Sequence, residues 1–162
     1  MKTDKKVNNN HVFFWGGVFS NFYPSNFTVD KITFFTSEQY FMWGKAVAMG
    51  DMESAQKIIK EKKPGACKAL GREVKPYNGS LWDNIRESVM YTAIYHKFTQ
   101  SEDLKKALLD TGKKMIVESS PEDKIWGIGI STEDAPYIPE NEWPGKNLLG
   151  IALMKLREEL KK

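Results

Sequence analysis

A carboxyl group and an amine, those of Glu38 and Lys45, lie seven residues apart in a segment that is otherwise largely apolar. On a helix this spacing places both side chains on nearly the same face, with their Cα atoms about 10 Å apart along the axis. That separation is too long for a surface ion pair, but two long side chains could converge on a ligand between them. Alternatively, Lys45 is solvated and Glu38 only favours a helix N-terminus. Because neighbouring aromatic residues predict a buried helix, in which charged groups need partners or a function, we favour a ligand site.

Two later segments carry groups that could contact a planar or anionic ligand. Gly127 and Gly129 leave the backbone open to close approach, and the neighbouring Trp126 could stack on a base or a sugar. Lys146 and Asn147 precede a predicted helix, whose free amide groups together with the lysine would suit a phosphate. The alternatives are a strand with packing glycines and a core tryptophan, and simple capping of the helix by Asn147.

Several common catalytic and cofactor sites are missing from the sequence. It contains no G-x-x-x-x-G-K-[ST] phosphate loop and no G-x-S-x-G nucleophile motif. Gly127 and Gly129 begin a dinucleotide fingerprint, but Thr132 stands where its third glycine should be. His11 and His96 have no partners at metal-ligand spacing. We therefore expect neither a metal nor an organic cofactor.

The composition is that of one globular domain with a core of its own. The chain has 162 residues, of which 41% are hydrophobic and 28% charged. The single cysteine, Cys67, excludes an internal disulfide, and we interpret it as structural rather than reactive. Residues 1–10 are polar, and no run approaches the ~20 apolar residues of a membrane span, so we predict a soluble, cytoplasmic protein.

The net charge of +3 is too small to indicate a nucleic-acid-binding surface by itself. It fits a small anionic ligand equally well. Arg72, which follows Gly71, is a further candidate for binding an anion, and a solvated surface position is the alternative.

Helical patterns dominate the chain, with four or five short strands between them. Strands are predicted over residues 12–15, 114–118 and 125–130, and a hairpin over residues 27–35. Helices are predicted over residues 36–48, 51–60 and 66–70, and after the capping residues Ser80, Ser101 and Asn147. Because strands and helices do not alternate regularly, we predict a mainly helical α+β fold. It would form a single domain over residues 11–162, with a flexible tail over residues 1–10.

These motifs resemble, in their order along the chain, those of the NADAR (YbiA-like) family. The resemblance extends from about Phe14 to Leu160. It rests on Phe19–Pro24, Thr36–Tyr40, Lys45–Ala46, Gly71–Arg72, Trp82, Met90, Lys97–Phe98, Ile116–Glu118, Ser120–Pro121, Asp123, Trp126–Gly129, Gly145–Gly150 and Leu153–Met154.

The resemblance implies a YbiA-like fold and an N-glycosidase that hydrolyses the C1–N bond of a phosphorylated ribosyl compound. The implied substrates are ADP-ribose attached to a guanine base, free or within DNA or RNA, and a ribosylamino pyrimidine phosphate of riboflavin synthesis. A module that binds ADP-ribose or NAD without cutting it is the alternative function. A nucleic-acid-binding protein with an aromatic surface is a second one.

Motif positions imply roles for individual residues. Glu38 would be the acid or base and Lys45 the nucleophile toward the anomeric carbon, while further residues would line the ligand site: Asn21, Gln39, Arg72, Trp126, Gly127, Gly129, Lys146 and Asn147. Position 39 departs from the family because it is Gln where many members have His. Position 128 is Ile where the riboflavin-intermediate branch tends to have Asp, which argues against that branch's substrate.

Overall fold

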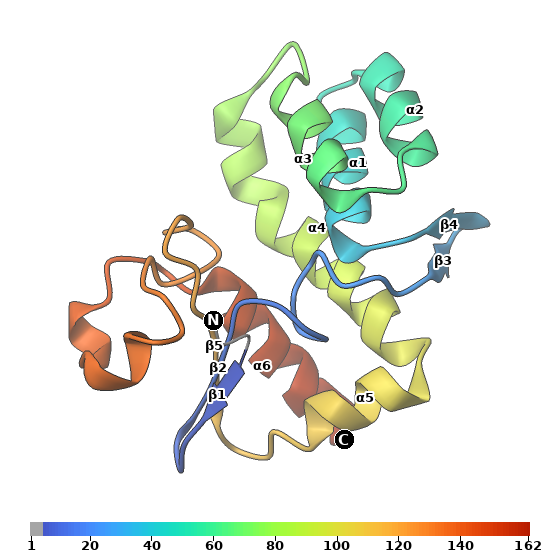
Figure 1. The fold of residues 1–162 in the computed structure, drawn as a ribbon. Coiled ribbons are helices and arrows are strands. Elements are labelled where there is room, and N and C mark those ends of the chain that lie inside the picture. Colours follow the sequence, from blue (N-terminus) through green and yellow to red (C-terminus); the bar gives the residue numbers. More distant parts are fainter. Residues whose placement is uncertain (1–4) are drawn as a thin grey trace. The chain divides into compact units, whose positions relative to one another are not determined.

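The computed structural model describes residues 5–162, and residues 1–4 lie outside the described part. The described residues form six α-helices, two short 3-10 helices and five short strands in two small sheets (Figure 1). This confirms the predicted, mainly helical α+β fold. The chain forms two compact units, which we call the helical unit (Asn21–Ser101) and the sheet unit (Met1–Ser20 with Glu102–Lys162). The single domain over residues 11–162 stays a prediction.

The helical unit begins with the predicted hairpin, formed by strands β3 (Phe27–Val29) and β4 (Ile32–Phe34). Its two turn residues, Asp30 and Lys31, both have positive φ angles, 49° and 72°. Two consecutive left-handed residues match the right-handed twist of the paired strands. The hairpin therefore forms although neither turn residue is glycine.

Four helices follow in the helical unit, and α1 packs against each of the other three (Figure 1). They are α1 (Ser37–Ala48), α2 (Met52–Lys60), α3 (Pro64–Arg72) and α4 (Gly79–Thr99). Thr36 caps α1, because its hydroxyl accepts a hydrogen bond from the Gln39 backbone N–H at 3.0 Å. The predicted cap of α4 was wrong. Asn78, not Ser80, accepts a hydrogen bond from the Leu81 N–H at 3.0 Å, so the helix begins earlier.

Helix α3 is longer than predicted and packs closely on α1. Pro64 stands in its first turn, where the missing N–H would have no partner within the helix. Near its other end, a Cβ atom on Gly71 would overlap the sulfur of Met42 on α1. Glycine at position 71 therefore sets how closely the last turn of α3 approaches α1.

Substituting Gly71 with alanine should lower the free energy of unfolding by about 1–3 kcal/mol, because the added methyl group forces Met42 to move in a packed interface. Gly65 on the same helix is the matched control, since a Cβ there meets no atom within 4 Å. Urea unfolding of the two alanine variants measures the difference. Equal stability of both variants would contradict the close packing at Gly71.

The sheet unit contains a three-stranded sheet in the order β1–β2–β5. Strand β2 (His11–Phe14) pairs antiparallel with β1 (Lys5–Val7) and parallel with β5 (Met115–Glu118). Strand β1 lies within residues 1–10, which we predicted to be a flexible tail, and its pairing with β2 gives residues 5–7 a defined position. One face of the sheet contributes Phe13 and Val117 to a buried cluster with Ile128 and Ala135.

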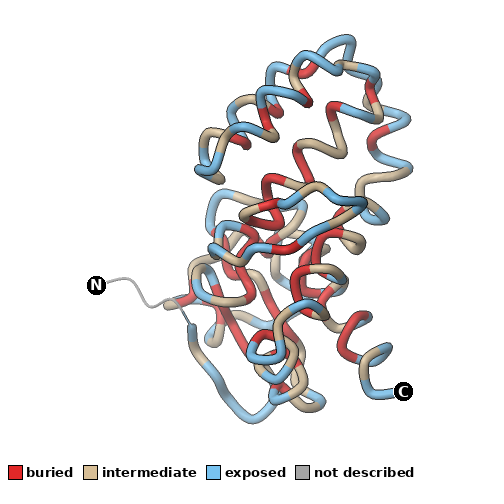
Figure 2. The backbone as a smooth tube through the Cα atoms, turned by 90° about the vertical axis from the view of Figure 1, so that its right-hand side faces the viewer, coloured by how far each residue is buried: buried red, intermediate tan, exposed pale blue. Residues whose placement is uncertain are grey.

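Two helices complete the sheet unit, α5 (Glu102–Leu109) and α6 (Leu148–Leu160). Helix α6 packs on β5 and α5, and its buried leucines recur every three or four residues: Leu149, Leu153 and Leu156. Buried and exposed positions alternate in this way along the helices of both units (Figure 2). Among residues 5–162, no helix is long and apolar enough to cross a membrane.

Candidate active site

Glu38 lies in the first turn of α1 and is buried, with only 7% of its surface exposed. Its backbone N–H donates a hydrogen bond to the Asn21 carbonyl at 3.0 Å. An acidic side chain at this end of a helix interacts favourably with the helix dipole. Glu38 is also close enough to Cys67 on α3 for its charge to act on that thiol. The carboxyl group thus belongs to the start of α1 and lies close to α3.

Asn21 holds the beginning of α1 in place. Its amide oxygen accepts a hydrogen bond from the Ser37 hydroxyl at 2.8 Å, and its amide nitrogen donates to the Met90 sulfur at 3.4 Å. A thioether is a weak acceptor, and the amide nitrogen has a second hydrogen. Asn21 therefore positions Glu38 through the backbone and keeps a donor that a ligand could use.

Gln39 is engaged in hydrogen bonds within the fold, and the ligand contact implied by its motif position stays a prediction. Its amide nitrogen lies 2.9–3.1 Å from three carbonyl oxygens at the end of α2, those of Ile58, Ile59 and Glu61. Its amide oxygen accepts from the Phe35 N–H at 2.7 Å. The side chain is fully buried, and these bonds use both of its donor hydrogens. Gln39 joins α1 to α2 and has no hydrogen left for a substrate.

Lys45 lies in the last turn of α1, and Arg72 in the last turn of α3. Partial burial lowers the pKa of Lys45 below its ordinary value, and the nearby positive charge of Arg72 lowers it further. The amine is therefore neutral, and nucleophilic, at a lower pH than an ordinary lysine. Lys45 and Arg72 together also form a cationic pair that suits an anionic group.

Cys67 is buried on α3, and its thiol donates to the Glu61 carbonyl at 3.3 Å. Burial raises the pKa of Cys67 to about 12, and the charges of Glu61 and Glu38 contribute to the rise. The thiol is thus protonated at neutral pH, which supports the structural role that we predicted for it.

Alkylation of Cys67 by iodoacetamide at pH 8 should be at least about a hundredfold slower in the folded protein than in urea, because only the thiolate reacts. Mass analysis of the peptide that carries Cys67 follows the reaction. Equal rates in buffer and in urea would show that the thiol is accessible and ionised in the native protein.

The amide groups at the N-terminus of α6, where the sequence predicts a phosphate site, are engaged within the chain. The N–H groups of residues 146–149 donate to carbonyl oxygens of the segment Lys124–Gly127, with distances of 2.9–3.2 Å. These bonds cap the helix from within the chain, so its first amide groups are not free for a phosphate. The same pairing keeps residues 125–130 out of a sheet, and the strand predicted there does not form.

Gly127 and Gly129 allow the chain to pack on itself rather than opening the backbone to a ligand. A Cβ on Gly127 would lie 2.8 Å from the Glu118 carbonyl oxygen and 3.0 Å from that of Asp123. Gly129 has a φ angle of 76°, which disfavours other residues. The predicted close approach exists, but at Gly127 the approaching groups are the protein's own carbonyls.

Asn147 likewise acts within the sheet unit. It precedes α6 in a left-handed conformation, and its side chain does not cap the helix. Its amide oxygen accepts from the Glu118 N–H at 2.9 Å, and its amide nitrogen donates to the Ile116 carbonyl at 3.0 Å. The side chain therefore ties α6 to β5. Trp126, half-buried, and Lys146, exposed, stay predictions as ligand contacts.

Two further residues of the helical unit were not among the predicted site residues. Lys97 on α4 is 1% exposed, and burial lowers its pKa to about 7. Its amine lies 5.7 Å from the centroid of the Tyr23 ring and 5.0 Å from that of Phe98. The sequence signal that could have identified Lys97 as a buried position is its helical spacing from Met90 and Ile94, which are buried on the same helix. The second residue is Tyr77, whose ring lies under the Lys45 amine.

The comparisons with known proteins agree with this architecture. A family model described as the NADAR domain matches residues 13–161. A protein of Acanthamoeba polyphaga mimivirus, named as an N-glycosidase, is 44% identical over 98% of this chain and 98% of its own length. N-glycosidase YbiA of Escherichia coli is 33% identical, over 89% of this chain and 81% of that protein. The NMR structure of YbiA matches with a TM-score of 0.78 and 30% identity, over 98% of this chain and 89% of that one.

Proposed function

The chain belongs to the NADAR family and is a hydrolase of N-glycosyl bonds, and we propose that it cuts the C1–N bond of a phosphorylated ribosyl compound. One observation carries this proposal: helix α1 holds a buried carboxyl group at its start and an amine of lowered pKa near its end. Breaking a C1–N bond requires a proton for the leaving nitrogen and a partner for the anomeric carbon. Glu38 and Lys45 supply these two functions.

In the first step, the neutral Lys45 amine forms a bond to C1 while the bond from C1 to the base nitrogen breaks. Glu38, in its acid form, gives its proton to the departing nitrogen and becomes a carboxylate. The attached amine loses a proton, the ring oxygen leaves C1 and is protonated, and an iminium forms between Lys45 and the opened sugar. Water then adds to C1 and gives a proton to the Glu38 carboxylate. The bond from C1 to the Lys45 nitrogen breaks, which releases the sugar and restores the Glu38 acid and the Lys45 amine.

The phosphate of the substrate would bind at Arg72. This residue is exposed at the end of α3 and acts electrostatically on Lys45, so it faces the same region of the helical unit. The amide groups at the start of α6 are engaged by carbonyl oxygens, which supports Arg72 as the phosphate contact. The second hydrogen on the amide nitrogen of Asn21 could reach a ribose hydroxyl near Glu38.

ADP-ribose attached to a guanine base is the substrate that we favour, free or within DNA or RNA. Position 128, where the riboflavin-intermediate branch tends to have Asp, carries Ile in this chain. Ile128 is fully buried in the apolar cluster of the sheet unit, where it cannot replace a carboxylate contact to a pyrimidine.

Incubation with ADP-ribosylated guanosine, NAD and the ribosylamino pyrimidine phosphate, followed by mass analysis of the products, tests the proposal. We expect release of guanosine and ADP-ribose from the first compound, at a higher rate than release of the base from either other compound. Hydrolysis of the pyrimidine compound alone would overturn the substrate but keep the reaction. Ligand-dependent stabilisation without release of any base would instead indicate a binding module.

A further inference from the structure

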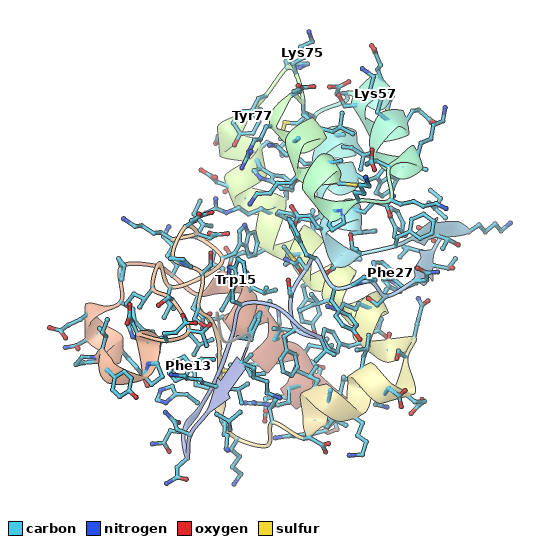
Figure 3. All side chains as sticks on the ribbon, in the orientation of Figure 1. Phe13, Trp15, Phe27, Lys57, Lys75 and Tyr77 are labelled. Carbon is cyan, nitrogen blue, oxygen red and sulfur yellow. The ribbon has the colours of Figure 1, made fainter. Side chains whose placement is uncertain are left out.

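Tyr77 lies in the loop between α3 and α4 (Figure 3). Its surface is 55% exposed. The Lys45 amine lies over its ring, 5.1 Å from the ring centroid. At this distance an ammonium group is attracted to the face of an aromatic ring. The ring therefore acts on the group that the proposed reaction uses as nucleophile.

The loop that carries Tyr77 is fixed to the turn between α1 and α2. The Lys75 N–H donates to the Asp51 carboxylate at 3.1 Å, and the Asn78 N–H donates to the Met49 sulfur at 3.2 Å. These two bonds lie on either side of Tyr77 and hold its backbone next to the end of α1. The ring also lies against the backbone of Gly79, where a Cβ would be only 3.4 Å from it. The ring is thus placed by its surroundings although its face is exposed.

Lys45 faces two groups with opposite effects. The charge of Arg72 opposes a second positive charge beside it, whereas the ring of Tyr77 attracts one. A lysine side chain without a partner samples many rotamers, and a ring that receives the amine reduces that freedom. Tyr77 therefore supplies the one aromatic contact that the described residues offer to this amine.

We propose that Tyr77 is a positioning residue: its ring holds the Lys45 ammonium beside the site before its proton is lost, and the neutral amine attacks the substrate from that place. The part of this inference that concerns attack rests on the proposed function, while the contact itself does not. The aromatic face, rather than the hydroxyl group, carries the effect. Tyr77→Phe should therefore behave like the native protein, and Tyr77→Leu should not.

Labelling of Lys45 with acetic anhydride across a pH series, read by mass analysis of its peptide, tests the contact without any turnover. In Tyr77→Leu the ammonium loses a stabilising contact, so the midpoint of labelling should fall by about half a pH unit. Tyr77→Phe should keep the native midpoint. Tyr137→Leu is the matched control, because Tyr137 is 81% exposed and lies under a different amine, that of Lys6. Thermal unfolding confirms that each variant is folded.

Trapping with borohydride in the presence of ADP-ribosylated guanosine tests the consequence for the reaction. At a pH above the labelling midpoint of every variant the Lys45 amine is neutral in all of them, so only its placement differs. There the rate of adduct formation at saturating substrate should fall about two- to fivefold in Tyr77→Leu, with little change in KM, and should be native in Tyr77→Phe. If Tyr77→Leu labels at the native midpoint, the inference is overturned. If the midpoint shifts but no protein forms an adduct, the contact stands and the proposed reaction fails.

Discussion

Replacing Glu38 with glutamine should lower kcat by about 10²–10⁴-fold, the range expected when a general acid is removed. Glutamine has nearly the same shape as glutamate but cannot give a proton to the departing base. The hydrogen bond from the Glu38 backbone to Asn21 and the bond from the Ser37 hydroxyl to Asn21 do not involve the Glu38 side chain. The first turn of α1 should therefore keep its structure. Substrate binding should therefore change little.

Rates of guanosine release under saturating substrate measure this effect, and ligand-dependent thermal stabilisation measures binding. Glu53→Gln is the matched control, since Glu53 is an exposed acid in the first turn of α2 and pairs with Lys57 at 3.5 Å. It should retain native activity. A Glu38→Gln protein with native kcat would remove Glu38 from the reaction.

Replacing Lys97 with methionine should raise the free energy of unfolding at pH 7 by about 2–4 kcal/mol, because it removes an amine whose charged form is costly to bury. The pKa of Lys97 is about 7 in the folded protein, against 10.5 for an ordinary lysine. Methionine is similar in length and suits the neighbouring rings of Tyr23 and Phe98.

The free energy of unfolding should depend on pH because the pKa of Lys97 differs between the folded and the unfolded chain. Between pH 7 and about 10.5 the unfolded chain binds more protons at this position than the folded chain, so the stability of the native protein rises with pH. Below pH 7 both states are protonated and the full cost is present. The advantage of Lys97→Met should thus be largest below pH 7 and disappear near pH 10. A variant that is less stable than the native protein at every pH would show that the fold holds this ammonium in its charged form.

Local signals in the sequence predicted most of the elements. The capping of α1 by Thr36 and of α2 by Asp51, and the hairpin turn at Asp30–Lys31, depend on residues a few positions apart. The seven-residue spacing of Glu38 and Lys45 is of the same kind, because the period of a helix fixes it. Such features depend on residues that are close in the sequence and not on contacts with distant parts of the chain.

Hydrogen-bond partners that are distant in the sequence could not be predicted from it. The amide groups at the start of α6 looked free because their partners are the carbonyls of Lys124–Gly127, some twenty residues earlier. Gln39 looked available because its acceptors lie at the end of α2. A backbone carbonyl carries no signal in the sequence, so neither partner could be predicted. The same holds for Tyr77, whose contact with Lys45 depends on how the loop before α4 folds back.

In the proposed reaction, Lys45 and Glu38 act together on the anomeric carbon of a bound ribose. Reduction with borohydride during turnover, followed by peptide mapping, tests it most directly, because an iminium becomes a stable secondary amine. We expect one adduct, on Lys45, with the mass of the reduced ADP-ribosyl group. It should be absent from Lys45→Ala and form more slowly in Glu38→Gln. Normal release of guanosine by Lys45→Ala, with no adduct on any lysine of the native protein, would show that Lys45 is not the nucleophile.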